Sequence, residues 1–343
     1  MILRIKIVIV ISRNHCWSYT GRMIKGHGHE IGHLSEFDRR KFLKLSGLMT
    51  GVIILDSIIF LNQSAALPKA RIPGFSAFSD SVRVFRSEKY YLVESSGLPS
   101  HQMMVGIKNW QQQVPTVQAY SGSNVWSIPI KPVVATNPIS AKDHFFRGAI
   151  ALAVNGVPIF NALNNRGEDA LLAGELDDWG GHCGRADDYH YHIAPTHLQT
   201  VLGKKVPIAY ALDGFPIYGE TEADGKPAVG LDSFNGHFDS KKKYHYHATK
   251  YYPYINGGFK GIVNEIEGQV DPQARTKPFR PPGTPLRGAS ITGFESFGKD
   301  IFELRYLLNG GQYQIKYSAS LREVVLQTID PQGNTRTEIY QRK

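Results

Sequence analysis

The stretch of sequence that decides the fold occurs twice. Residues 181–192 read GHCGRADDYHYH, and residues 236–247 read GHFDSKKKYHYH. At a shift of 55 residues the Gly-His dipeptides coincide, and so do the Tyr-His-Tyr-His tetrapeptides. Upstream, residues 151–160 (ALAVNGVPIF) match residues 209–218 (AYALDGFPIY) at a shift of 58. Because only two copies of this long repeat are present, we predict two pseudo-symmetric halves, over about 146–200 and 204–258, rather than a solenoid.

The histidines of this repeat have the spacing of metal ligands. In a strand, alternate side chains share a face, so each His-x-His pair projects together while the flanking tyrosines project oppositely. The histidine of each Gly-His lies eight residues earlier, far enough for a turn to bring it back as a third ligand. The predicted ligands are His182, His190, His192, His237, His245 and His247. We expect the two halves to bring them towards one place. The sequence allows either one shared binuclear site or two separate three-histidine sites.

Imidazole ligands suit zinc, copper, nickel and iron, and we expect a transition metal, copper or zinc, as the cofactor. Three histidines are weaker, reserve ligands: His101, His144 and His197. The charged pair Asp187 and Asp188, just before the first tetrapeptide, is expected to lie in solvent rather than to orient a ligand.

Cys183 is the one cysteine downstream of residue 66, so it has no partner for a disulfide within that part of the chain. Burial in the core is the simplest role for such a cysteine. A metal ligand beside His182 and an intermolecular bridge are the alternatives.

The first 66 residues read as an export leader. They hold nine Lys or Arg against four Asp or Glu, which is more than half of the formal net charge of +9. Residues 38–44 (DRRKFLK) resemble a twin-arginine export motif, an apolar stretch follows over 45–61, and 63–66 (QSAA) is a candidate cleavage site. The predicted partner is therefore the twin-arginine export machinery, with an uncleaved membrane anchor as the alternative. We expect the mature chain in the periplasm or outside the cell, with membrane contact only through the leader.

The remaining chain reads as mainly β. Short runs rich in Val, Ile and Tyr are separated by turn residues, and Asn155-Gly156 and Asp213-Gly214 are hairpin signals. We predict a sandwich or distorted barrel over 67–262, with few short helices, at 168–179 and 195–202. The proline-rich segment 263–287 is expected to be a linker or strap, and 288–343 to form further strands.

Composition excludes several classes of function. With 42% hydrophobic and 20% charged residues the chain is globular, and the positive charge outside the leader is scattered. No basic stripe accompanies a nucleic-acid motif, so nucleic-acid binding is disfavoured. Neither a Gly-x-Ser-x-Gly nucleophile elbow nor a glycine-rich phosphate or dinucleotide motif is present in the sequence.

With both Tyr-His-Tyr-His tetrapeptides identified, the chain resembles the YHYH-domain family. The resemblance runs from about Tyr90 to Gly261 and includes residues 155–158 (NGVP) and 212–219 (LDGFPIYG). It implies an exported bacterial protein and carries no assigned activity or catalytic residue.

Two functions follow from the sequence. The first is an exported, histidine-rich metal-binding protein, which could be a metalloenzyme of the cell envelope or a carrier without turnover. The second is a non-enzymatic binding module, in which the Tyr and His strands form a groove for a glycan, lipid or protein of the envelope and no metal is needed. Histidines converging within chelating distance would favour the first, and histidines scattered over opposite faces the second.

Overall fold

In this computed structural model the described residues are two short strands, β1 (Ile7–Val10) and β2 (Cys16–Tyr19), and residues 67–109, 115–120, 125–281, 283–298 and 300–342. β1 and β2 pair as an antiparallel hairpin. The predicted export motif, apolar stretch and cleavage site fall outside the described residues. Within the described part, every helix is too short or too polar to span a bilayer.

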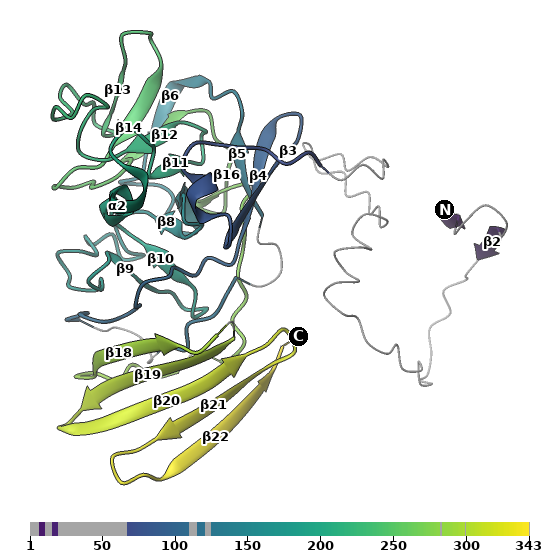
Figure 1. The fold of residues 1–343 in the computed structure, drawn as a ribbon, viewed down its shortest axis with the longest axis vertical. Coiled ribbons are helices and arrows are strands. Elements are labelled where there is room, and N and C mark those ends of the chain that lie inside the picture. Colours follow the sequence, from purple (N-terminus) through teal and green to yellow (C-terminus); the bar gives the residue numbers. More distant parts are fainter. Residues whose placement is uncertain are drawn as a thin grey trace. The chain divides into compact units, whose positions relative to one another are not determined.

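The two repeats form one open eight-stranded sheet (Figure 1). Its strands follow the order β13-β14-β12-β11-β7-β8-β10-β9. The first repeat supplies β7 (Ala149–Ala153), β8 (Pro158–Phe160), β9 (Gly181–Cys183) and β10 (Tyr189–Tyr191). The second repeat supplies β11 (Ala209–Ala211), β12 (Pro216–Tyr218), β13 (Gly236–Phe238) and β14 (Tyr244–His247).

The strand order is symmetric about its centre, because each strand of one repeat mirrors its counterpart in the other. The halves join through β7 and β11, which pair antiparallel with Leu152 opposite Tyr210. Those two residues are equivalent in the repeat, so a local two-fold axis passes between them. Corresponding registers also agree: Ile159 lies opposite Tyr191 in one half, and Ile217 opposite Tyr246 in the other. The predicted pseudo-symmetric halves are confirmed.

The two hairpin turns form at the predicted positions. Gly156 and Gly214 have φ of 86° and 97°, a conformation that favours glycine. Pro158 and Pro216 each stand at the first position of their strand, as a residue without an amide donor must in an interior strand.

Four smaller sheets accompany the large one in the described residues from 67 onwards. An antiparallel three-stranded sheet holds β3 (Val82–Arg86), β4 (Tyr90–Ser95) and β5 (Val125–Pro129). Two pairs are β6 (Val134–Ser140) with β15 (Gly258–Gly261), and β16 (Glu265–Ile266) with β17 (Gln269–Val270). The fourth is a five-stranded meander of β18 (Ser290–Ser296), β19 (Ile301–Leu308), β20 (Gly311–Ala319), β21 (Glu323–Ile329) and β22 (Thr335–Gln341). The mainly β class is confirmed, and no described sheet closes into a barrel.

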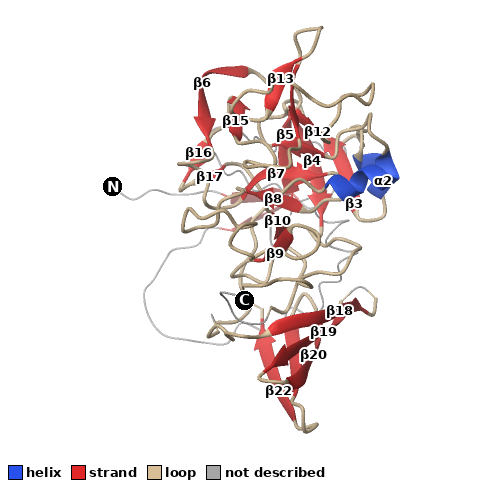
Figure 2. Ribbon diagram, turned by 90° about the vertical axis from the view of Figure 1, so that its left-hand side faces the viewer, coloured by secondary structure: helices blue, strands red, loops and turns tan. Residues whose placement is uncertain are grey.

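Helix is scarce in the described chain, as Figure 2 shows. It consists of the 3-10 turns η1 (Phe75–Phe78) and η2 (Thr196–Leu198) and the single turn α2 (Gln199–Leu202). The short helix predicted at 195–202 is therefore confirmed, whereas the one predicted at 168–179 is wrong. There a single i→i+4 bond, from the Ala173 amide to the Asp169 carbonyl, is followed by Gly174 at φ 74°, which reverses the chain.

One hydrophobic core joins the large sheet to its neighbours. It includes Val93 of β4, Ile150 of β7 and Phe302 of β19. The interior residues of β7 are all buried, because neighbouring structure covers both faces of this central strand. The sheet that carries the histidines thus has a buried centre, and its histidine strands lie at its two ends.

Candidate metal centres

The six predicted ligands form two separate groups rather than one. Site one consists of His182, His190 and His192; site two consists of Glu222, His237, His245 and His247. In each group the ligand atoms lie within 4.8 Å of one another. Site one lies on β9, β10 and the residue after β10, and site two on β13, β14 and a loop, at opposite ends of the sheet. The expectation that all six gather in one place is therefore wrong.

The reason for the separation is the way the repeats meet. They join through β7 and β11, the strands farthest from the histidines, so the local two-fold axis carries the two histidine groups outward. Of the two arrangements open from the sequence, the structure has two separate three-histidine groups.

Each histidine of site one is oriented by a backbone carbonyl that accepts a hydrogen bond from its Nδ1. The acceptors and N···O distances are Glu175 for His182 at 3.0 Å, Asp188 for His190 at 3.0 Å, and Asn161 for His192 at 2.5 Å. A carbonyl can only accept, so Nδ1 carries a proton, and in the neutral form of each ring Nε2 is the bare nitrogen. All three Nε2 atoms are therefore available as ligands.

Site two repeats this arrangement. The carbonyl of Val229 accepts from His237 at 3.0 Å, and that of Gly219 accepts from His247 at 2.8 Å. The Lys243 backbone bonds His245, as the equivalent Asp188 does for His190. Such outer hydrogen bonds are the usual means by which proteins fix the tautomer and direction of a metal-binding imidazole.

The bare nitrogens face each other at short range. Nε2 of His182 lies 3.0 Å from Nε2 of His192, and Nε2 of His237 lies 3.0 Å from Nε2 of His245. Two ligands bonded to one zinc ion at 2.0–2.1 Å in tetrahedral geometry lie about 3.3 Å apart. The spacing therefore fits nitrogens that share a small cation, whereas two lone pairs with nothing between them repel.

Burial makes protonation a poor way to relieve that repulsion in site one. Burial, with the charge of His190 as a second cause, lowers the pKa of His182 to about 3. Burial likewise lowers the pKa of His192 well below its usual value. Both rings are neutral at physiological pH, so no shared proton bridges the 3.0 Å gap.

Site two has a carboxylate that the sequence did not suggest. Oε1 of Glu222 lies 3.0 Å from Nε2 of His237 and 3.4 Å from Nε2 of His247, and Oε2 lies 3.8 Å from Nε2 of His245. The Nε2 of His247 is buried without a hydrogen-bond partner. Three nitrogens and a carboxylate make a complete donor set for a four-coordinate ion such as zinc.

The tyrosines of both tetrapeptides are buried away from the histidine side, as strand alternation predicted. Each also has a carboxylate or amide partner. The hydroxyls of Tyr189 and Tyr244 donate to Asp177 at 2.8 Å and Asp232 at 2.9 Å. Asn155 donates to the Tyr191 hydroxyl at 3.1 Å, and the Tyr246 hydroxyl donates to Asp213 at 2.6 Å. The tyrosines thus fix the strands that present the histidines.

Asp177 and Asp232 occupy equivalent positions, four residues before each Gly-His, and sequence reasoning overlooked them. Each also accepts a hydrogen bond from the glycine of that dipeptide, at 3.0 Å for Gly181 and 3.2 Å for Gly236. A Cβ on either glycine would lie 2.5 Å or less from the tyrosine hydroxyl, so only glycine fits. The signal was present, because the aspartate recurs at the same 55-residue shift.

The predicted solvent exposure of Asp187 and Asp188 is wrong. Both are buried, at 1% and 6% exposure. Asp187 forms a two-pronged ion pair with Arg280, at 2.9 and 2.8 Å, which secures the proline-rich segment. Oδ2 of Asp188 lies 3.7 Å from Nδ1 of His190. Arg280 lies 93 residues away in sequence, so no local pattern pointed to this pair.

Cys183 is a buried free thiol. It follows His182 on β9 and therefore projects to the opposite face of the sheet, the tyrosine side. Burial raises its pKa well above the usual value, which leaves it protonated. It belongs to the core and not to site one.

The reserve ligands join neither group. His101 and His197 lie on the tyrosine side, where His101 stacks on Trp179 at 4.6 Å and its Nε2 lies 2.7 Å from the Tyr191 hydroxyl. His144 pairs with Glu265 at 2.9 Å near the surface.

Comparison with known families confirms the resemblance read from the sequence. The family model described as YHYH protein matches residues 125–228. This range contains the whole of site one and Glu222, and it ends before the three histidines of site two. No curated protein and no solved structure matches the chain.

Proposed function

We propose that this chain is a metal-binding protein that holds one copper or zinc ion at site one and one at site two. The observation that carries the proposal is the pair of buried, carbonyl-oriented imidazoles, His182 and His192, whose Nε2 atoms face each other at 3.0 Å. A cation is the species that turns this repulsive contact into a favourable one.

The donor set supports a transition metal rather than calcium or magnesium. Six imidazoles and one carboxylate are offered, and imidazole suits zinc and copper, whereas calcium and magnesium prefer oxygen ligands. A bound ion would supply Lewis acidity or, if it is copper, a one-electron redox centre. The residues of the chain orient the donors and exclude water from the buried side of each group.

We further propose that the protein is exported through the twin-arginine route to the periplasm or beyond. Support comes from the basic leader with its paired arginines at 39 and 40. Both donor groups combine separate strands and loops, so they exist only after folding, and a route used by folded proteins suits a chain that binds its metal first.

Elemental analysis of protein purified after export from its native host tests the metal directly. We expect about two equivalents of copper or zinc per chain. Alanine at both His190 and His192 should remove at least half of the metal, whereas His144→Ala, outside both sites, should remove none. A metal-free wild-type protein would overturn the proposal and favour the non-enzymatic binding module.

A further inference from the structure

The duplication allows each residue around site two to be compared with its counterpart around site one. The loops 163–169 and 221–227 are equivalent, since each closes with a bridge, Leu163 to Asp169 and Thr221 to Pro227. The amides of Asn164 and Glu222 make the same 2.8 Å bond to a carbonyl four residues on. Asn164 therefore occupies in the first half the position of Glu222 in the second.

The two side chains at this position do different things. Glu222 places its carboxylate among the three histidines of site two, 3.0 Å from the nearest Nε2. Asn164 instead donates from Nδ2 to Glu168 at 3.1 Å and to Glu175 at 3.2 Å. Its Oδ1 accepts hydrogen bonds from the Arg166 amide at 2.9 Å and the Glu168 amide at 3.1 Å, so the polar atoms of this side chain are bonded within the network and not to the site-one histidines. Site one therefore has three protein donors where site two has four.

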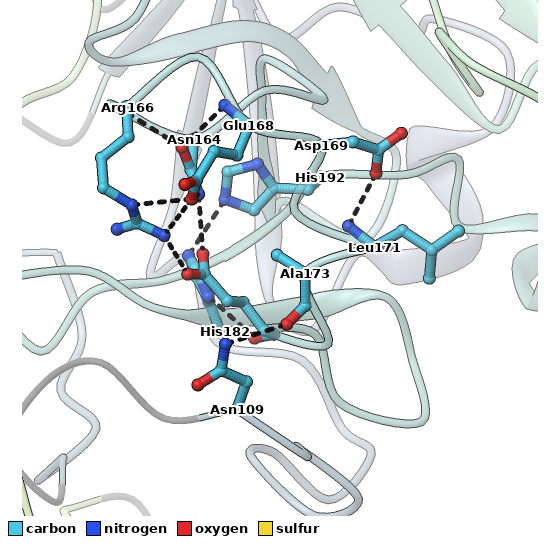
Figure 3. Close-up of polar contacts among 10 residues, drawn as sticks. Asn109, Asn164, Arg166, Glu168, Asp169, Leu171, Ala173, His182 and His192 are labelled. Carbon is cyan, nitrogen blue, oxygen red and sulfur yellow. Dashed lines mark hydrogen bonds and ion pairs between the residues drawn. The ribbon is translucent and has the colours of Figure 1, made fainter. Parts of the chain in front are cut away.

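The surroundings of site one also differ from those of site two. Arg166 pairs with both Glu168 and Glu175, forming the polar network with Asn164 that Figure 3 shows beside His182 and His192. In the second half the equivalent residues of the loop, Asp224 and Lys226, pair only with each other and are largely exposed. The Glu175 carboxylate is buried, but Arg166 and Asn164 occupy it, so it is not a free anion for a cation in site one.

The two sites differ in the charge of the ligands that they offer to a cation. A divalent cation in site two would have the negative charge of Glu222 as a ligand. In site one the protein ligands of the cation would all be imidazoles, of which His190 and His192 are only 3% and 4% exposed, and the Asp188 carboxylate lies outside this group, 3.7 Å from Nδ1 of His190. A buried charge that its own ligands do not compensate is costly, so the cation would recruit an anion from solution.

We infer that site one is an open site that takes a small anion with an oxygen or nitrogen donor, such as a carboxylate, in the position that Glu222 fills in site two. Site two is closed by its own glutamate and has a structural role. This division rests on the proposed function, that both groups hold a metal, and it parallels the general contrast between open catalytic and closed structural zinc sites.

A surface cleft of about 590 Å³ adjoins the polar network beside site one. Its lining includes Asn109, Arg166, Glu168 and Asp169, and none of the three histidines. Arg166 is the cationic residue of this lining, and its side chain is 44% exposed. A carboxylate ligand would therefore compete with Glu168 and Glu175 for this guanidinium.

Cobalt-loaded protein titrated with azide tests the inference, because the visible spectrum of Co²⁺ reports the binding of an added ligand. Wild-type protein should hold two Co²⁺ ions and bind one azide per chain, and acetate should displace that azide. Glu222→Asn should raise the number of azide-binding sites from one to two. Asn164→Glu should lower it from one to zero while both cobalt ions stay bound.

The outcomes distinguish failure of the open and closed assignment from failure of metal binding itself. Two cobalt ions with azide at both sites, or at neither, in the wild-type protein would overturn the open and closed assignment while leaving metal binding intact. A chain that binds no cobalt would overturn the proposed function itself. If Asn164→Glu fails to fold, Glu222→Asn decides alone, and one azide per chain in that variant would refute the inference.

Discussion

Alanine at His192 and at His247, singly and together, tests whether the two sites act independently. His192 directly follows β10, and His247 is the last residue of β14. The two strands are five strand spacings apart in the sheet, or about 24 Å at roughly 4.8 Å per spacing. Substitutions more than about 10 Å apart usually have additive effects, within about 0.5 kcal/mol. Each single variant should therefore lose one bound ion of two, and the double variant should lose both.

The magnitude follows from binding linkage. With free metal at about 100 times Kd, one occupied site raises the unfolding free energy by about 2.7 kcal/mol. The difference in unfolding free energy between loaded and metal-free protein should then be about 5.4 kcal/mol for wild type, about 2.7 for each single variant and near zero for the double variant. Taking this difference removes the packing cost of each alanine, since that cost is present with and without metal.

Urea unfolding with and without zinc, combined with metal analysis of each variant, measures these quantities. His144→Ala serves as the control and should match wild type, because His144 lies outside both sites. A single alanine that empties both sites would refute the reasoning. So would a double variant whose loss departs from the sum of the singles by more than about 1 kcal/mol.

Three further predictions concern the scaffold, the pH response and export. Tyr246→Phe removes the hydroxyl that donates to buried Asp213 at 2.6 Å, so urea unfolding should show a loss of about 1–3 kcal/mol. Tyr251→Phe, at an 81% exposed residue, should change stability by less than about 0.5 kcal/mol. In metal-free protein, between pH 6.5 and about 3, His182 takes up a proton only in the unfolded state. It should therefore lower the unfolding free energy by about 1.4 kcal/mol for each unit by which the pH falls in this range. His182→Gln should lack this pH dependence, and an unchanged slope in that variant would contradict the prediction. Lysine at both Arg39 and Arg40 should trap the precursor inside the cell in a fractionation assay, and normal export of that variant would exclude the twin-arginine route.

The sequence predicted those parts of the fold that depend on local patterns. Strand alternation placed the tyrosines and histidines of each tetrapeptide on opposite faces, and Asn155-Gly156 and Asp213-Gly214 fixed the two hairpins. The repeat also predicted equivalent halves, because the same residues in the same order make the same strand register. These inferences needed only neighbours in sequence.

The prediction failed where the answer depends on which strands meet. Nothing in either repeat says that β7 and β11 form the junction, so the separation of the histidine groups could not be read from spacing. Glu222 was missed because its counterpart, Asn164, is not acidic, and a comparison of the repeats hid it. The burial of Asp187 depends on Arg280, which a local view of the loop does not include.

The junction of the two repeats has a consequence for the ancestry of the fold. Strands β7 and β11 pair around a local two-fold axis through equivalent residues, which is the geometry of an isologous homodimer. A chain with only one repeat would expose β7 as an unpaired, wholly apolar edge, a feature prone to edge-to-edge association. Two such chains could satisfy both edges by pairing β7 with β7, with Leu152 on the axis. The two repeats of the present chain thus have the geometry of a two-fold dimer joined in one chain, and this covalent connection allows the two equivalent loops to carry different residues, Glu222 in one and Asn164 in the other.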